Sequence, residues 1–221
     1  MYRFFKRLLD LLLSVTAIII LTPFFIPIVI GLKFTGEGHV FYKQKRIGLN
    51  NSNFFILKFA TMLKDSPNLG TGSITLRNDP RVTPMGGFLR KTKINELPQI
   101  FNILLGDISI VGPRPLVDKT FSAYSEEIQS KIYNVKPGLT GIGSIIFRDE
   151  EELISNSNEE PHVFYESVVA PYKGALEMWY QKNASIITDL RIIFLTAWVI
   201  LFSNSRLPYA IFKTLPKRPL D

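Results

Sequence analysis

The most apolar stretch of the chain lies near its N-terminus. Leu11 to Leu32 carries no charged side chain, and one straight helix of this length would be about 33 Å long, enough for a hydrocarbon core of about 30 Å. Pro23 and Pro27 each remove a backbone donor and clash with the preceding turn, which leaves about 18 Å of uninterrupted helix up to Thr22. We therefore expect a re-entrant hairpin kinked at Thr22-Pro23, where the Thr22 hydroxyl meets freed carbonyl groups. A spanning helix is the alternative.

Basic residues flank this segment on both sides: Arg3, Lys6 and Arg7 before it, and Lys33, Lys43, Lys45 and Arg46 after it. Because positively charged flanks stay in the cytoplasm, both ends are expected on the cytoplasmic face. A second apolar stretch, Ile192 to Phe202, has only 11 residues and is too short to span. It is either a buried core helix or an amphipathic helix lying in the membrane interface.

Between these segments the pattern predicts an α/β fold that is mostly helical, with a small sheet. Short strands are expected at 40–42, 53–59 and 107–111, and helical spacing covers 87–105, 121–135 and 166–183. Three regions follow: a re-entrant membrane segment at 1–33, a cytosolic, membrane-associated domain at 34–205, and a basic, proline-containing tail at 206–221.

Composition narrows the partners. The chain has 26 Lys and Arg against 19 Asp and Glu, a net charge of +7, which favours an anionic partner such as phosphate, a membrane surface or nucleic acid. Nucleic acid is disfavoured, because it leaves the apolar segment unexplained and the aromatic residues do not alternate with the cations. Without cysteine, and with only two histidines, a bound metal would need oxygen ligands and would be a hard cation.

The first candidate site is Asn95-Glu96, just before a helix that begins near Pro98. A carboxylate there, with Arg90 upstream, lies where backbone donors favour anions and phosphate. The alternative is an ordinary helix cap formed by Asn95. The second candidate is Arg114 between Pro113 and Pro115, where fixed backbone angles reduce the entropy lost in presenting the guanidinium to a phosphate. Its alternative is a rigid turn with a solvated arginine.

A third candidate set consists of cations spread over loops, of which about a third are expected to line a site: Lys43, Lys45, Arg46, Lys58, Arg77, Arg81, Arg90 and Arg148.

Taken in order, these segments resemble the bacterial sugar transferase family, the monotopic phosphoglycosyl transferases, from about residue 6 to about residue 202. The resemblance rests on the proline-kinked N-terminal segment and on eight stretches: Lys43 to Gly48, Leu57 to Met62, Asp79 to Thr83, Leu89 to Thr92, Glu96 to Gln99, Gly106 to Ser109, Val111 to Pro115 and Lys136 to Gly141. It implies transfer of a phosphosugar from a UDP-sugar to undecaprenyl phosphate, with magnesium and release of UMP, to initiate glycan assembly. The location implied is the cytoplasmic face of the bacterial inner membrane, with membrane lipid as a partner and a homodimer left open.

The resemblance also implies roles for individual residues. Glu96 and Asn95 would be catalytic and would hold magnesium. Substrate binding would fall to Arg90, Arg114, Pro113, Pro115, Lys58, Arg46, Arg81, Arg148 and Asp189.

Two positions depart from the family pattern. Members typically carry Asp-Glu where this chain has Asn95-Glu96, and many have arginine at the position of Ala60. The aspartate is held to be the covalent nucleophile, whereas an amide is a poor nucleophile and a weaker ligand for a hard cation. Three interpretations remain: an altered mechanism using Glu96, a substitution that traps an inactive form, or natural loss of activity. The alternative function is a catalytically impaired membrane protein that binds nucleotide sugar or polyprenyl phosphate.

Overall fold

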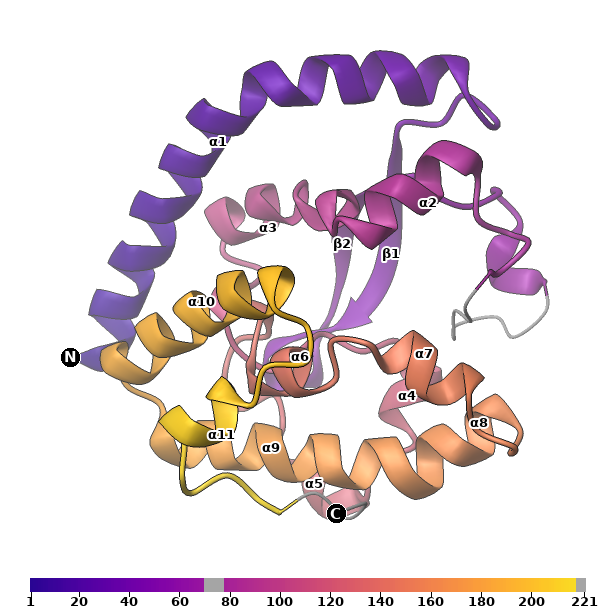
Figure 1. The fold of residues 1–221 in the computed structure, drawn as a ribbon. Helices are drawn as coiled ribbons and strands as arrows, with labels where there is room; N and C mark the ends of the chain where they lie inside the picture. The colour runs from indigo at the N-terminus through magenta and orange to yellow at the C-terminus, as the bar shows by residue number, and fades with distance from the viewer. Residues whose placement is uncertain (70–77, 218–221) are drawn as a thin grey trace.

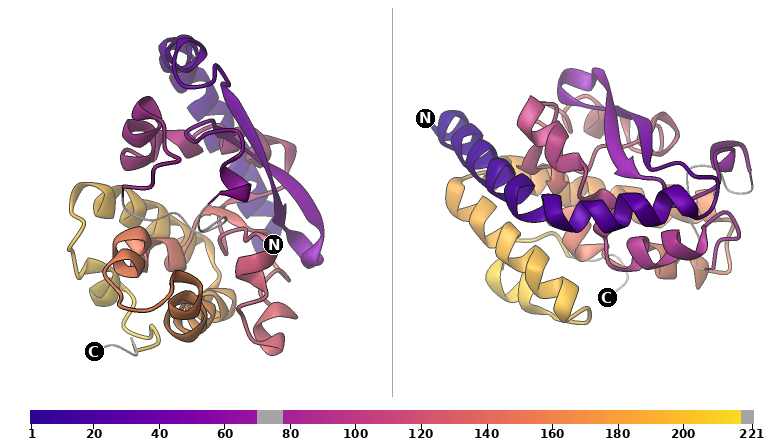
Figure 2. Two further views of the ribbon diagram at one scale, coloured as in Figure 1. Left: turned by 90° about the vertical axis from the view of Figure 1, so that its right-hand side faces the viewer. Right: turned by 90° about the horizontal axis from the view of Figure 1, so that it is seen from above.

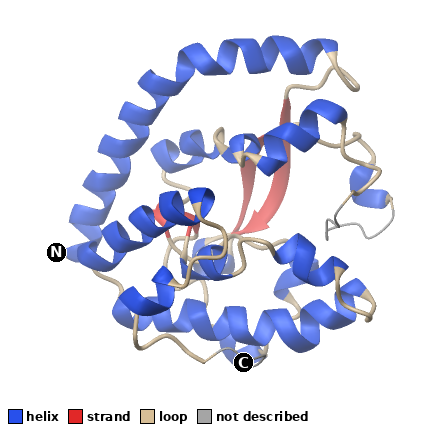
Figure 3. Ribbon diagram, viewed as in Figure 1, coloured by secondary structure: helices blue, strands red, loops and turns tan. Residues whose placement is uncertain are grey.

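The computed structural model describes residues 1–69 and 78–217. One long N-terminal helix, α1, arches over a body of short helices and two small sheets (Figures 1 and 3). Figure 2 shows the β-hairpin standing beside this arch, with the C-terminal helices on the other side of the body. The described part of the chain is therefore mostly helical with little sheet, as its pattern predicts.

α1 runs from Tyr2 to Phe34 and continues through Pro23 and Pro27. It bends along its length (Figure 1) but does not fold back on itself as a hairpin. The Thr22 hydroxyl donates to the Ile18 carbonyl at 2.6 Å, one residue before the carbonyl that Pro23 deprives of its donor. The expectation that the Thr22 hydroxyl bonds the carbonyl freed by Pro23 is therefore wrong. A threonine hydroxyl bonded to the carbonyl four residues earlier instead favours bending of the helix.

Two polar side chains at the start of α1 converge on one aspartate. Asp189 is 1% exposed and accepts hydrogen bonds from Lys6 Nζ at 2.7 Å and the Tyr2 hydroxyl at 2.9 Å. Tyr180 donates to its other oxygen at 2.7 Å. Because both carboxylate oxygens are occupied, Asp189 serves to fasten α1 to the body.

The next turns of α1 are fastened to two other elements. Arg7 Nη1 donates to the Ile103 carbonyl at 2.7 Å, near the end of α3. Asp10, 3% exposed, accepts from the Ser109 hydroxyl at 3.0 Å and the Ile110 amide at 2.9 Å. Separating α1 here would leave the Ser109 hydroxyl and the Ile110 amide without their acceptor, so these hydrogen bonds hold the N-terminal half of α1 on the body.

The C-terminal end of α1 returns to the same body. Leu32 is 2% exposed and forms a small core with Phe59 and Leu89. Between the two docked ends the helix is open, with Ile19 69% and Phe24 62% exposed. Among the described residues α1 is the one helix long and apolar enough to cross a membrane, and only 6% of its most apolar stretch is buried.

The two sheets are small. β1 (Phe41–Ile47) pairs antiparallel with β2 (Asn53–Phe59), with Phe41 opposite Phe59. β3 (Ser109–Val111) pairs in parallel with β4 (Gly138–Thr140). The predicted strands at 40–42 and 107–111 therefore exist with shifted bounds, and the one at 53–59 matches in full.

The remaining elements are short helices, except for α9 and α10. The predicted helix over 87–105 is divided, because Lys93 adopts a left-handed backbone with φ of 60° that an α-helix cannot continue through. The main core packs α9 and α10 against α6, with Leu176, Leu195 and Ile142 fully buried. The bounds are α2 Pro84–Lys91, α3 Gln99–Leu105, α4 Asp118–Phe121, α5 Glu126–Gln129, α6 Ile142–Ile146, α7 Glu150–Ser155, α8 Pro161–Phe164, α9 Ala170–Asn183, α10 Ile186–Leu201 and α11 Leu207–Ile211, with 3₁₀ turns η1 Leu49–Asn51, η2 Ser66–Asn68 and η3 Ile94–Glu96 and the π-helical turn η4 Tyr165–Val169.

Candidate functional site

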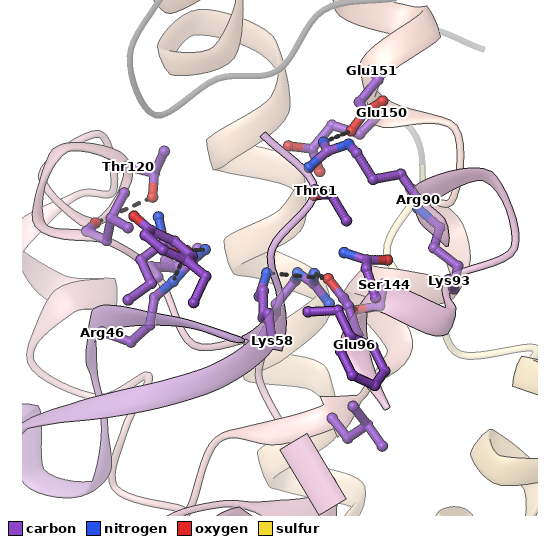
Figure 4. A pocket seen from close by; sticks show the side chains of 18 of the residues that line it. Arg46, Lys58, Thr61, Arg90, Lys93, Glu96, Thr120, Ser144, Glu150 and Glu151 are labelled. Carbon is purple, nitrogen blue, oxygen red and sulfur yellow. Dashed lines mark hydrogen bonds and ion pairs between the residues drawn. The ribbon is translucent and has the colours of Figure 1, made fainter. Parts of the chain in front are cut away.

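A cavity of about 1280 Å³ opens in the middle of the body. Its walls come from β1, β2, η3, the segment after β3, and helices α6, α7, α9 and α10. Figure 4 shows that cationic and acidic side chains from these elements point into it. Segments that are far apart in the sequence thus meet around one space large enough for a nucleotide-sized ligand.

Glu96 lies at the centre of this charged group. Its side chain is 15% exposed and accepts hydrogen bonds from Lys58 Nζ at 3.3 Å and from Arg114 Nη2 (Figure 4). Burial alone would raise the pKa of the carboxyl, but Arg114 and Lys58 outweigh burial and hold that pKa well below its usual range. Glu96 is therefore an ionised carboxylate between two cations.

Local structure places these three side chains. Glu96 ends η3, the single turn between α2 and α3 that the left-handed Lys93 creates. Lys58 is on β2, and Arg114 follows β3 in the turn that Pro113 and Pro115 stiffen. The structure thus brings together Glu96, Lys58 and Arg114, three of the residues that the sequence singles out.

The site holds more positive charge than Glu96 alone can balance. Burial lowers the pKa of Lys58 to about 7, an effect that Glu96 opposes and the neighbouring arginines reinforce. Burial and the nearby Arg114 lower the pKa of Arg46 to about 10, and Arg46 Nη1 donates to the Pro115 carbonyl at 2.9 Å. Lowered pKa values on neighbouring cations mean that a bound anion would stabilise their charged forms, which favours phosphate.

Asn95 adjoins Glu96 but does not cap the following helix, because α3 is preceded by Pro98. The predicted capping role is therefore wrong. Asn95 is 5% exposed, and its Oδ1 finds no hydrogen-bond partner in the described part of the chain. A buried oxygen without a partner is costly unless a ligand or water satisfies it.

A magnesium ion would find suitable donors here. Magnesium prefers hard oxygen ligands and usually takes one or two carboxylates together with substrate phosphates and water. The Asn95 Oδ1 that lacks a partner and the neighbouring Glu96 carboxylate match that donor set. Residues 1–69 and 78–217 contain no group of three or more acidic, histidine or cysteine side chains able to hold a metal, so such an ion would depend on substrate oxygens.

Two predicted arginines lie at the edge of the cavity and are already paired with carboxylates. Arg90 Nη2 is 2.6 Å from Glu151, and Arg148 Nη1 is 3.3 Å from Asp149. Both arginines line the cavity. Each is paired through a single guanidinium nitrogen, so its remaining N–H groups can still donate to a substrate.

Other predicted residues lie elsewhere. Arg81 is buried, contacts Asp79 at 2.6 Å and donates to the Ser66 carbonyl at 2.9 Å, so it holds a loop together and does not line the cavity. Asp189 fastens α1, and Pro113 and Pro115 flank Arg114 without lining the cavity. Arg77 is outside the described residues.

Sequence reasoning missed several cavity residues. Ser144 of α6 lines the same cavity (Figure 4), and its hydroxyl has no hydrogen-bond partner among the residues described. Lys173 of α9, 4% exposed, forms an ion pair with Glu150. Lys173 could have been noticed because it is a lysine on the apolar face of a predicted helix. Ser144 lies among glycines, and nothing in its neighbourhood indicates a role.

Behind the cavity, Glu177 of α9 is also buried. It is 1% exposed, and within the described structure its oxygens make no hydrogen bond of normal geometry. Its Oε1 lies so close to Gly143 that a Cβ there would collide with it, which explains the glycine. Burial raises the pKa of Glu177 to about 8, so the side chain is mostly neutral at pH 7.

Comparisons with known proteins place the chain among sugar transferases by sequence. The family profile described as "Bacterial sugar transferase" matches residues 1–203. The chain is 33% identical over 214 residues to the Salmonella typhimurium "Undecaprenyl-phosphate galactose phosphotransferase" and 33% identical over 213 residues to the Haemophilus influenzae "Uncharacterized sugar transferase". Each match covers 90% of this chain but 41% of the relative, so the chain spans about two fifths of their length. "Exopolysaccharide production protein ExoY" of Rhizobium meliloti is 34% identical over 213 residues, covering 90% of this chain and 86% of the relative.

Proposed function

The chain belongs to the bacterial sugar transferase family, and from this we propose that it transfers a phosphosugar from a UDP-sugar to undecaprenyl phosphate and releases UMP. The names of relatives such as the Xanthomonas campestris "UDP-glucose:undecaprenyl-phosphate glucose-1-phosphate transferase" support this reaction. The observation that carries it here is Glu96, held ionised between Lys58 and Arg114 in a cavity of nucleotide size. Such a reaction would initiate a surface polysaccharide.

The proposed chemistry is phosphoryl transfer. An oxygen of the prenyl phosphate attacks the phosphorus that bears the sugar, the bond from this phosphorus to the bridging oxygen breaks, and UMP leaves with that oxygen. Lys58 and Arg114 hold the phosphates and stabilise the charge that grows on the leaving group. Magnesium bound by Asn95, Glu96 and substrate oxygens would supply further charge neutralisation. Asn95 has no carboxylate, so a covalent route would have to pass through Glu96.

We further propose that α1 enters one leaflet and leaves on the same side. Its N-terminal turns are bonded to Asp189 and Ser109, and Leu32 at its other end packs on Phe59. A spanning helix would have to break one of these two sets of contacts, since one body cannot lie on both faces of a membrane. Cysteines introduced at Tyr2 and Lys43 should both resist an impermeant thiol reagent in intact cells, and labelling of only one would contradict the proposal.

Exposed apolar side chains on other helices support contact of the body with a membrane, which we propose to be the inner membrane at its cytoplasmic face. Phe88 of α2 is 61% exposed, Leu105 of α3 77%, and Phe194 of α10 52%. Single exposed apolar residues are normal on a protein in water, but α2, α3 and α10 all pack against α1, whose most apolar stretch is itself only 6% buried. We propose that these helices lie in the membrane interface beside α1.

The function is tested by incubating purified protein with a panel of UDP-sugars, undecaprenyl phosphate and magnesium, and measuring UMP. We expect UMP with at least one sugar, and its loss in Glu96→Gln. Glu126→Gln, on the exposed surface of α5, is the matched control and should keep full activity. Binding of a UDP-sugar without UMP release in any combination would favour the alternative, a catalytically impaired protein that binds nucleotide sugar or prenyl phosphate.

A further inference from the structure

One wall of the cavity differs chemically from the charged centre around Glu96. It is formed by β3, β4 and α10 and is almost entirely apolar. The side chains that line the cavity from these elements are Ile110, Leu139, Thr140, Ile193, Thr196, Ala197, Val199 and Ile200. The sugar hydroxyls and the diphosphate of a nucleotide sugar would lose hydrogen bonds to water against such a wall without replacing them.

Helical geometry makes this wall continuous with the outer surface of the molecule. Positions 193, 197 and 200 are three or four residues apart, so they share one face of α10. Phe194 and Leu201, each one residue further along, lie on an adjacent face and are 52% and 75% exposed. The apolar lining of the cavity on α10 is therefore next to an exposed apolar face of the same helix.

The wall is fixed close to the phosphate-binding cation. Thr196 Oγ1 lies 2.7 Å from Thr140 Oγ1, which joins α10 to β4. β4 pairs with β3, and Arg114 follows the end of β3 by three residues. The apolar wall and Arg114 thus belong to one connected unit.

We propose that the face of α10 formed by Ile193, Ala197 and Ile200 binds the isoprene units next to the phosphate of the prenyl acceptor. This inference rests on the proposed function and identifies which side of its site takes the acceptor. Charge complementarity favours this occupant. A phosphate head bound at Arg114 and Lys58 places the attached apolar tail beside this apolar wall. The exposed face of α10 then leads the rest of the tail to the lipid.

The first test is Ala197→Trp, whose larger side chain would fill part of the cavity beside α10. We expect the KM for undecaprenyl phosphate to rise at least tenfold and the KM for the UDP-sugar to change less than twofold. Ala210→Trp, on an exposed position of α11 outside the cavity lining, is the matched control and should leave both constants unchanged. Equal effects on both substrates, or none, would overturn the proposal.

A binding test separates this inference from the reaction itself. Calorimetry compares geranyl phosphate, which has two isoprene units, with methyl phosphate, which has none. The unmodified protein should bind geranyl phosphate at least tenfold more tightly, and both Ala197→Trp and the milder Ile193→Ala should reduce that ratio. An unchanged ratio in both variants refutes the α10 site even if UMP release is normal, whereas absent UMP release with the expected ratio refutes only the proposed function.

Discussion

Replacing Glu177 by glutamine tests the electrostatics behind the site. Burial raises the pKa of Glu177 from 4.5 to about 8, while in the unfolded chain the carboxyl keeps its ordinary value. Between those two values the folded protein holds a proton that the unfolded chain releases. Stability therefore falls as the pH rises from about 4.5 to about 8, and Glu177→Gln should abolish this part of the pH dependence.

The size of the effect follows from the pKa difference. Holding a carboxyl of ordinary pKa 4.5 protonated at pH 7 costs up to about 3 kcal/mol, at about 1.4 kcal/mol per pH unit. An amide of the same shape avoids this cost. For a domain of this size the gain corresponds to an increase of about 6 to 12 °C in the melting temperature at pH 7, and to almost none near pH 4.5.

The assay is thermal unfolding in detergent at several pH values between 4.5 and 8.5. Glu166→Gln, on an exposed position of η4 just before α9, is the matched control and should follow the unmodified protein at every pH. A constant difference between Glu177→Gln and the parent across this range, or a difference that shrinks toward high pH, would refute the reasoning.

Three further predictions concern the centre of the cavity. Arg114→Lys keeps the charge but loses the planar fork, and removing a charge-assisted phosphate contact costs about 1.5 to 3 kcal/mol, so UMP release should fall about ten- to a hundredfold; parental turnover would contradict the assignment. The Lys58 pKa of about 7 means that this cation loses its proton as the pH rises through 7, so the KM for the UDP-sugar should increase several-fold between pH 6 and 8, and a Lys58→Arg variant with the same pH dependence would exclude this cause. Asn95→Asp restores an anionic oxygen beside Glu96 and should raise turnover and tighten magnesium dependence. Mass spectrometry of this variant would detect a phosphosugar adduct at position 95. Slower turnover without an adduct would show that the amide suits the parent mechanism.

The sequence predicts much of the site because its charged residues fall within short, stiff segments. Arg114 between two prolines and Glu96 before Pro98 are local features, and local features survive folding with their geometry almost intact. The β1–β2 hairpin is predictable for the same reason, since alternating residues surround a turn in which Asn50 and Asn51 adopt positive φ.

Long-range pairing is what the sequence does not reveal. Asp189 was expected near substrate, but its partners Tyr2 and Lys6 are 187 and 183 residues away, and no pattern of neighbours announces such a contact. The prolines of α1 do not end the helix, which is continuous through Pro23 and Pro27. Contacts that the sequence does not reveal hold its C-terminal half, where Phe25 packs edge-on against Phe59. The positions of Ser144 and Glu177 likewise could not be predicted, because they depend on the packing of α6 against α9.

The fastening of α1 to Asp189 has a consequence for how the protein is made. α1 is synthesised before the body it docks on, and the aspartate that fixes Lys6 follows 183 residues later. At about 5 to 20 residues per second, Lys6 waits roughly 10 to 40 s for its partner. During that interval α1 is only an apolar helix with basic flanks, and the contacts that distinguish entry into one leaflet from crossing do not exist. In the proposed one-leaflet arrangement, the topology of α1 would therefore be completed by the folding of the body, after insertion and not during it.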